Sequence, residues 1–344
     1  MMLPALDDTT TSPVKTGPGT ARSGRLGLTL LGVILRRLAA IAALLVVVSF
    51  AVFSLLHLAP GNPVDLLLGT TPRSPETVAA LNRQYHLDEP FLQQYWAWAS
   101  DAARLRFGTS IQSSLPVSTE LSSRLPTSLF LGLYAFVLTM VLGVGLGVLS
   151  AVQHRRALDH STVAGTVVAL SAPTFVLGTA LLYAFAVRMN WFPAFGAGGG
   201  FLDRVWHLTL PALTLALTSC AYVVKHTRSA MIRVLDQDFI VFARARGLSL
   251  WQVLFGHALR NAAIPVITMS GFILSSLVIG AVLVEVTFSV QGIGQMLVKS
   301  ARAQDLPVMQ AVALLTAAAI MLTALLTDIV YMLADPRVRL GGRS

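Results

Sequence analysis

The residues with the most distinctive spacing lie in one stretch, Asp238–Pro265, which reads DFIVFARARGLSLWQVLFGHALRNAAIP. Asp238 is a good N-cap for a short helix over Phe239–Arg246. Gly247 suits the left-handed residue that ends such a helix. Ser249 opens the pattern S-L-W-Q, a capping box that starts a second helix. The stretch therefore predicts two helices joined by a tight turn.

The short helix is amphipathic. We expect Phe239, Phe242 and Ala243 to share one face, with Arg244 on another and Arg246 in the last turn. An apolar face with a basic flank costs free energy if it stays in water. It predicts docking into a groove of another protein. The alternative is a helix that lies flat on anionic lipid headgroups.

The sequence contains no recognisable catalytic motif. It contains no G-x-x-x-x-G-K-[ST] phosphate-binding run. It has no H-E-x-x-H, no nucleophile elbow and no paired carboxylates on a recognisable catalytic frame. The single cysteine, Cys220, excludes an internal disulfide and a Cys-rich metal site. We therefore expect neither enzyme activity, nor a metal, nor a cofactor bound by this chain.

The composition is that of an integral membrane protein. The chain has 344 residues, of which 55% are hydrophobic and 12% charged, and its mean hydropathy is +0.71. Soluble domains carry about 25% charged residues. The first residues, 1–30, are rich in Thr, Ser, Pro and Gly, and we expect them to form a disordered cytoplasmic extension.

Six apolar segments reach the length of about 20 residues that a spanning helix needs. They are Leu38–Leu58, Leu129–Ala151, Thr162–Val187, Leu208–Val224, Ala262–Val286 and Val308–Leu333. Gly143 and Gly147 permit close helix approach in the second. Pro173 predicts a kink in the third, which either lines a pathway or accommodates packing. The sequence thus predicts an all-α polytopic fold with six transmembrane helices.

Basic residues fix the predicted orientation. They gather in the N-terminal region, at Arg155–Arg156, over Lys225–Arg260 and over Arg337–Arg343. The positive-inside rule places these segments and both termini in the cytoplasm. The net charge of +9 is then a topology signal, and we expect no nucleic-acid partner.

We divide the chain accordingly. The expected parts are an extension 1–30, a first transmembrane helix 31–59, an extracytoplasmic helical region 60–126, a five-helix core 127–335 with a cytoplasmic loop 225–262, and a cytoplasmic tail 336–344. In the extracytoplasmic region Ser74-Pro75 and Pro90 each predict a helix start. The second of these helices carries an apolar face that either packs on the bundle or docks an external partner; it contains Phe91, Leu92, Tyr95 and Trp98.

Two carboxylates lie within spans, where ionisable residues are costly. Glu285, near the outer end of the fifth span, is expected to cap or gate the pathway. Asp328, in the sixth, is expected to pair with an arginine of a partner chain or of the cytoplasmic loop. Structural pairing is the favoured interpretation for both.

Several motifs carry a family resemblance. ARARGLS followed by HALRNAAIP resembles the cytoplasmic loop of ABC importer permeases for dipeptides, oligopeptides and related solutes, although the strict consensus around Gly247 keeps only Ala243 and Leu259. APGNPVDLLLG, LNRQYHLDEPFLQQYWAW, SSRLPTSLFLG, VEVTFSVQGIGQML and DIVYMLADPRVR resemble further family motifs in the expected order. Asn62 and Gln291 depart from the usual Asp and Pro. The resemblance covers residues 30–340.

The resemblance implies a type I ABC importer permease fold in a bacterial plasma membrane. It implies import of peptides, with nickel chelates or glutathione as alternatives. The implied partners are a second permease chain, cytoplasmic ATPase subunits that bind ATP and Mg²⁺, membrane lipid and an external binding protein that docks on 60–126 and 292–307. The short helix would act as a lever on the fifth span. Three alternatives are a secondary transporter, a channel and an intramembrane enzyme. The sequence shows no internal repeat for the first, no filter-like repeat for the second and no nucleophile–base pair for the third.

Overall fold

The computed structural model describes residues 21–58, 64, 68 and 73–334, and in these ranges it consists of helices and connections without a named β-strand. The helices are α1 (Ala21–Leu58), α3 (Pro75–Tyr85), α4 (Phe91–Ala103), α5 (Val117–Val152), α6 (Ala157–Ser171), α7 (Thr174–Leu181), α8 (Phe201–Leu235), α9 (Asp238–Ala245), α10 (Leu259–Thr287), α11 (Ile293–Arg302) and α12 (Leu306–Ala334), with the π-helical segments η1 (Leu182–Arg188) and η2 (Gln252–Ala258).

The predicted membrane architecture is confirmed. Among the described residues, five helices are long and apolar enough to span a bilayer, and the bent pair of α6 with α7 and η1 raises the number to six. The fourth predicted span is longer than expected, because α8 continues unbroken to Leu235. The expected cytoplasmic tail, 336–344, and the motif residue Asn62 lie outside the described residues.

The first helix begins earlier than expected. α1 starts at Ala21, within the extension that we expected to be disordered up to residue 30. No proline follows until after Leu58, so nothing in the covalent chain interrupts this helix. Residues 1–20 of that extension lie outside the described part of the chain.

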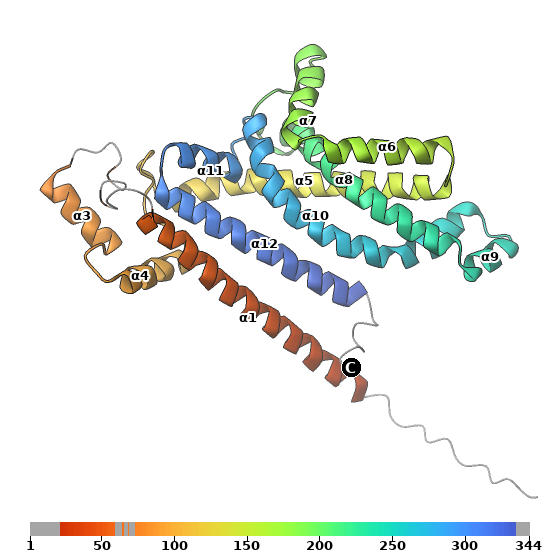
Figure 1. Cartoon of the computed structure of the whole chain (residues 1–344), viewed down its shortest axis with the longest axis horizontal. Coiled ribbons are helices and arrows are strands. Elements are labelled where there is room, and N and C mark those ends of the chain that lie inside the picture. Colours follow the sequence, from red (N-terminus) through yellow and green to blue (C-terminus); the bar gives the residue numbers. More distant parts are fainter. Residues whose placement is uncertain (1–20, 59–63, 65–67, 69–72, 335–344) are drawn as a thin grey trace, which may run out of the picture.

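The helices form one elongated bundle. α1 and α12 run antiparallel along one side, and α5, α6, α8 and α10 form the other (Figure 1). The short helix α9 lies at one end of the bundle, while α3, α4 and α11 lie at the other. In the predicted orientation, the α9 end is cytoplasmic.

The third predicted span is broken rather than kinked. α6 and α7 meet at an angle of 107°, and α7 projects away from the bundle in Figure 1. Proline lacks an N–H and disfavours a helical conformation for the residue before it. Ala172 is accordingly extended, with φ −81° and ψ 126°, and α6 ends at Ser171.

Close packing of α5 on α8 anchors the bundle. A Cβ atom at Gly143 would lie 2.5 Å from Val223 Cβ, and one at Gly147 would lie 2.6 Å from Thr227 Cβ. The two glycines therefore let the helix backbones approach closely, as their spacing predicts.

The helices α3 and α4 begin where the sequence predicts. Ser74 Oγ accepts a hydrogen bond from Thr77 N at 3.1 Å, and Pro75 is the first residue of α3. α4 follows Pro90 and packs against α1 through Tyr95, whose ring is edge-on to Phe50 at 5.3 Å. Leu92 was expected on this face, but its side chain is 61% exposed, so the prediction is wrong for this residue.

Candidate functional site

The loop that the sequence predicts to be cytoplasmic forms a compact helical turn. α9 spans Asp238–Ala245, one residue earlier than the sequence predicts. The N-cap is Gln237, with extended backbone and no side-chain cap hydrogen bond, so the expected N-cap role of Asp238 is wrong. Asp238 instead occupies the first turn, where a carboxylate favours the positive end of the helix dipole.

Gly247 ends α9 in the left-handed conformation, as predicted, with φ +80°. Its N–H donates to Arg244 O at 2.9 Å, and Leu248 N donates to Ala243 O at 3.3 Å. These two bonds form a Schellman motif, which satisfies carbonyls at the helix end. The turn is therefore fixed by backbone bonds.

The next helix begins with the predicted capping box. Ser249 N donates to Gln252 Oε1 at 2.9 Å, and Gln252 N donates to Ser249 Oγ at 3.4 Å. From Leu250 the helix continues through η2 into α10 without a break. α9 is consequently joined to the fifth span by one short, doubly capped turn.

The two faces of α9 differ from the expectation in one respect. Ile240 is fully buried and Ala243 is 8% exposed, and both pack with Met231 and Val253 in a small core under the loop. Ala243 therefore does not share a face with the phenylalanines. The three-residue spacing of Ile240 and Ala243 places both on the inner side.

The outer face of α9 is apolar and exposed. Phe242 is 68% exposed, Val241 60% and Phe239 38%. Trp251 and Phe255 on the following helix are also exposed, and their rings stack at 5.7 Å. With the exposed cations Arg244 and Arg246, they make an apolar surface with a basic border. Such a surface is characteristic of an interaction site.

A buried ion pair fixes the scaffold beside this loop. Asp159 of α6 is 2% exposed and accepts hydrogen bonds from Arg228 Nε at 2.6 Å and from Arg228 Nη2 at 2.8 Å. Ser150 Oγ and Arg155 N also donate to it. Asp159 therefore ties α5, α6 and α8 together two turns before α8 ends. The sequence analysis did not single out this pair.

Glu285 is a buried structural cap. Its side chain is fully buried. The carboxylate accepts hydrogen bonds from Ser128 Oγ at 2.6 Å, from Gly294 N at 2.7 Å and from Gln295 N at 3.1 Å. A Cβ atom at Gly292 would lie 2.3 Å from this carboxyl group. Glu285 thus holds the N-terminus of α11 to α10 and α5.

Asp328 pairs within the chain. Arg37 Nε lies 3.0 Å from Asp328 Oδ2, and Arg37 Nη2 donates to Asp328 Oδ1 at 3.4 Å. The expected partner was an arginine of another chain or of the cytoplasmic loop. Arg37 is instead on α1, because α1 and α12 run antiparallel and bring these positions together.

The two expected docking segments outside the membrane lie together. Asp305 is 1% exposed and accepts hydrogen bonds from Ser110 Oγ at 2.5 Å and Gln112 N at 3.2 Å. This buried carboxylate, which the sequence analysis missed, joins the start of α12 to the segment after α4. The part of 60–126 around Ser110 therefore meets the segment 292–307 at one end of the molecule.

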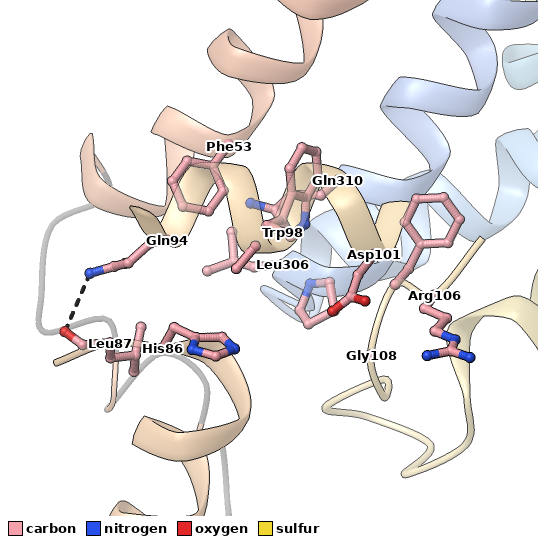
Figure 2. Close-up of a pocket in the computed structure, with 13 residues that line it drawn as sticks. Phe53, His86, Leu87, Gln94, Trp98, Asp101, Arg106, Gly108, Leu306 and Gln310 are labelled. Carbon is pink, nitrogen blue, oxygen red and sulfur yellow. Dashed lines mark hydrogen bonds between the residues drawn. The ribbon is translucent and has the colours of Figure 1, made fainter. Parts of the chain in front are cut away.

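A cavity of about 180 Å³ lies where these two segments meet. Its lining includes Trp98 and Asp101 of α4, Arg106 after that helix, and Leu306 and Gln310 of α12, all labelled in Figure 2. The lining mixes aromatic, charged and amide groups, so the cavity can hold water or a polar group of a docked protein. Among the described residues no group of His, Cys, Asp and Glu has the arrangement of a metal site.

Comparison with known proteins agrees with this architecture. Residues 143–340 match the family described as "Binding-protein-dependent transport system inner membrane component", and residues 30–132 match the N-terminal region described for such membrane components.

Individual relatives extend over nearly the whole chain. A probable peptide ABC transporter permease protein of Sinorhizobium fredii is 36% identical over 89% of this chain and 98% of its own length. A putative peptide transport system permease protein of Brucella abortus is 37% identical with the same coverage. The glutathione transport system permease protein GsiC of Escherichia coli is 34% identical over 90% of this chain and 99% of its own.

A solved structure shares the fold. An inward-facing form of the MetNI methionine ABC transporter has a chain that superposes with a TM-score of 0.53 at 17% identity, covering 63% of this chain and 96% of that one. The likeness supports the predicted importer permease fold and, at this identity, nothing about the transported solute.

Proposed function

Because this chain belongs to the family of binding-protein-dependent transport system inner membrane components, and is a permease of an ABC importer, we infer that it forms half of a pathway for peptides. Peptides are the solutes named for the Sinorhizobium and Brucella relatives. Glutathione is a second candidate, because it is named for the Escherichia coli relative, and it is itself a small peptide.

The exposed outer face of α9 is the observation that carries the coupling role. Its inner face packs on the protein's own core, so the helix does not need lipid or a partner to be ordered. On its outer face Phe242 is 68% exposed, and none of the described residues covers it. We propose that a groove on a cytoplasmic ATPase subunit receives it.

The ATPase subunits would bind and hydrolyse ATP with Mg²⁺, since the sequence has no phosphate-binding run of its own. Their closure would push α9, and the capped turn at Gly247 would pass the displacement to α10. Such a rigid-body shift converts nucleotide state into opening of one side of the bundle.

On the other side, an external binding protein would dock where α4 meets the start of α12, around Asp305. A second permease chain would complete the pathway. The basic residues beside α9 favour a cytoplasmic position for this end and for both termini in a bacterial inner membrane.

Phe242→Asp tests the coupling role. The variant should insert and fold normally, because Phe242 is exposed, yet it should lose at least ten-fold of the ATPase subunit that co-purifies with the wild-type complex. Phe195→Asp is the matched control, since Phe195 is 62% exposed in the connection before α8, at the other end of that helix. Unchanged ATPase recovery with Phe242→Asp would refute docking at α9.

A further inference from the structure

A cavity of about 250 Å³ lies at the break of the third span, between α6–α7, α8 and α10. Its lining includes five side chains with hydroxyl groups: Thr174, Thr218, Ser219, Tyr222 and Ser276. No Asp, Glu, Lys, Arg or His is among its lining residues.

The cavity lies deep in the bilayer. Ser276 is 14 residues from Ala262 and 10 residues from Val286, the ends of the predicted fifth span. At a rise of 1.5 Å per residue these separations are about 21 Å and about 15 Å. A cluster of hydroxyl groups at this depth would be costly against lipid, so it belongs to a polar interior.

The backbone at the break gives an independent reason for water here. α6 ends and α7 begins at the cavity wall, and Pro173 has no N–H to offer the carbonyl of Ala169. Non-helical backbone at membrane depth is tolerated only where protein buries it or where it lines a water-filled cavity. Ala169, Ala172 and Thr174 all line this cavity.

Two of the five hydroxyl groups are oriented by hydrogen bonds to their own helices. Thr218 Oγ1 donates to Leu215 O at 3.0 Å, and Ser276 Oγ donates to Ile273 O at 2.9 Å. Their protons are thereby used, and their oxygens remain as acceptors. The cavity thus offers uncharged groups that form weak hydrogen bonds, from which a passing solute can dissociate quickly.

We propose that this cavity is the part of the solute passage contributed by this chain, which rests on the proposed function. The solute class that suits it carries its own balanced charges, as a zwitterionic peptide does, and needs no ionic partner in the wall. Ligand pockets usually measure about 300–1,000 Å³. The smaller volume here fits a passage that a second permease chain completes.

Neighbouring residues provide matched controls. Ser275, next to Ser276, shares a hydrogen bond of 2.8 Å with Thr323 of α12 and does not line the cavity. Cys220, next to Ser219, is 7% exposed and does not line it either. If the cavity holds water, cysteines substituted at its lining should react faster than cysteines at these neighbouring positions. If the whole bundle is merely mobile, both sets should react alike.

The decisive experiment uses membrane vesicles and a positively charged methanethiosulfonate. In a Cys220→Ala background, Ser276→Cys and Ser219→Cys should be modified at least ten-fold faster than Ser275→Cys, and faster than native Cys220 in the wild-type chain. Equal rates at Ser276 and Ser275, or no reaction at Ser276 and Ser219, would overturn the proposal.

A transport measurement separates this proposal from the function on which it rests. The complex with its partner subunits is assayed for uptake of dialanine, trialanine and glutathione. Ser276→Phe should reduce uptake at least ten-fold while ATPase recovery is unchanged. Full uptake by this variant would refute the passage and leave the importer function intact. If the wild-type complex imports none of the three, the proposed peptide function fails, while the labelling result still decides whether the cavity is hydrated.

Discussion

Two short helices at opposite ends of the molecule are held in different ways. α11 begins under a buried carboxylate: Glu285 binds the N–H groups of Gly294 and Gln295, and Ser128 binds that of Ile293 at 2.8 Å. α9 has no side-chain cap at its N-terminus. It is held by the apolar contacts of Ile240 and Ala243 and by its C-terminal turn.

The difference indicates what each end does. The Glu285 carboxylate of α10 accepts hydrogen bonds from both α5 and α11. These three helices should therefore move as one rigid body. α9, in contrast, is packed on one side and exposed on the other, so a partner protein can bind its exposed face and displace it. The polar contacts at the α11 end therefore maintain geometry, whereas the apolar contacts at α9 leave one face available to another protein.

Loss of the Glu285 carboxylate should have the largest effect. Glu285→Ala leaves two buried N–H groups and the Ser128 hydroxyl without their acceptor. Each unsatisfied buried group costs about 1–3 kcal/mol, so thermal unfolding in detergent should show a large loss of stability or no folded protein. Glu89→Ala is the control, because its carboxylate is 43% exposed and its ion-pair partner, His86, is 45% exposed. Equal melting temperatures for both variants would contradict the structural role of Glu285.

The two faces of α9 should respond oppositely to truncation. Ile240→Ala removes a fully buried side chain and should cost about 2–5 kcal/mol, with loss of order in the loop detected by hydrogen exchange. Phe242→Ala should leave the unfolding temperature unchanged and weaken ATPase recovery. The comparison of α9 with α11 is wrong if Phe242→Ala destabilises the isolated chain as much as Ile240→Ala.

Local sequence patterns predicted the features that depend on near neighbours. The left-handed Gly247, the capping box at Ser249, the helix start at Ser74 and the glycine contacts of α5 involve spacings of a few residues or one helix face. For these features, the residues that cause the local structure are the same ones that form the sequence pattern. The six apolar segments follow from bilayer thickness alone, and so the fold class could be predicted as well.

Contacts between distant residues could not be predicted in this way. No pattern links Asp159 to Arg228 or Asp305 to Ser110, since the pairing depends on how the helices cross. The wrong partner for Asp328 has the same origin. A lone carboxylate at the start or end of an apolar segment was the only available signal, and it indicates that a partner is needed without identifying it. The register of α9 was off by one residue because Asp is favoured in the first turn of a helix as well as at the N-cap.

The turn after α9 should tolerate little change at Gly247. A non-glycine residue in the left-handed region costs about 1–2 kcal/mol, although a Cβ atom at Gly247 would meet nothing within 4 Å. Gly247→Ala should therefore lower the unfolding temperature slightly and uncouple ATPase binding from transport. Gly256→Ala in η2 is the control, because Gly256 has equal space and no positive φ. Identical transport by the two variants would show that the turn does not pass force to α10.

The smallest effect is expected for the ion pair of Arg37 and Asp328. Its measurement extends the comparison of α9 and α11 to the contact between α1 and α12. Both side chains are partly exposed, at 56% and 33%, and they join only α1 and α12. Exposed ion pairs contribute about 0–1 kcal/mol. A double-mutant cycle with Arg37→Gln and Asp328→Asn, measured by unfolding in detergent, should give a coupling energy in this range. A coupling as large as the loss in Glu285→Ala would mean that α1 is fixed to α12 as firmly as α11 is to α10. In that case displacement of α9 would act on a rigid frame that includes α1.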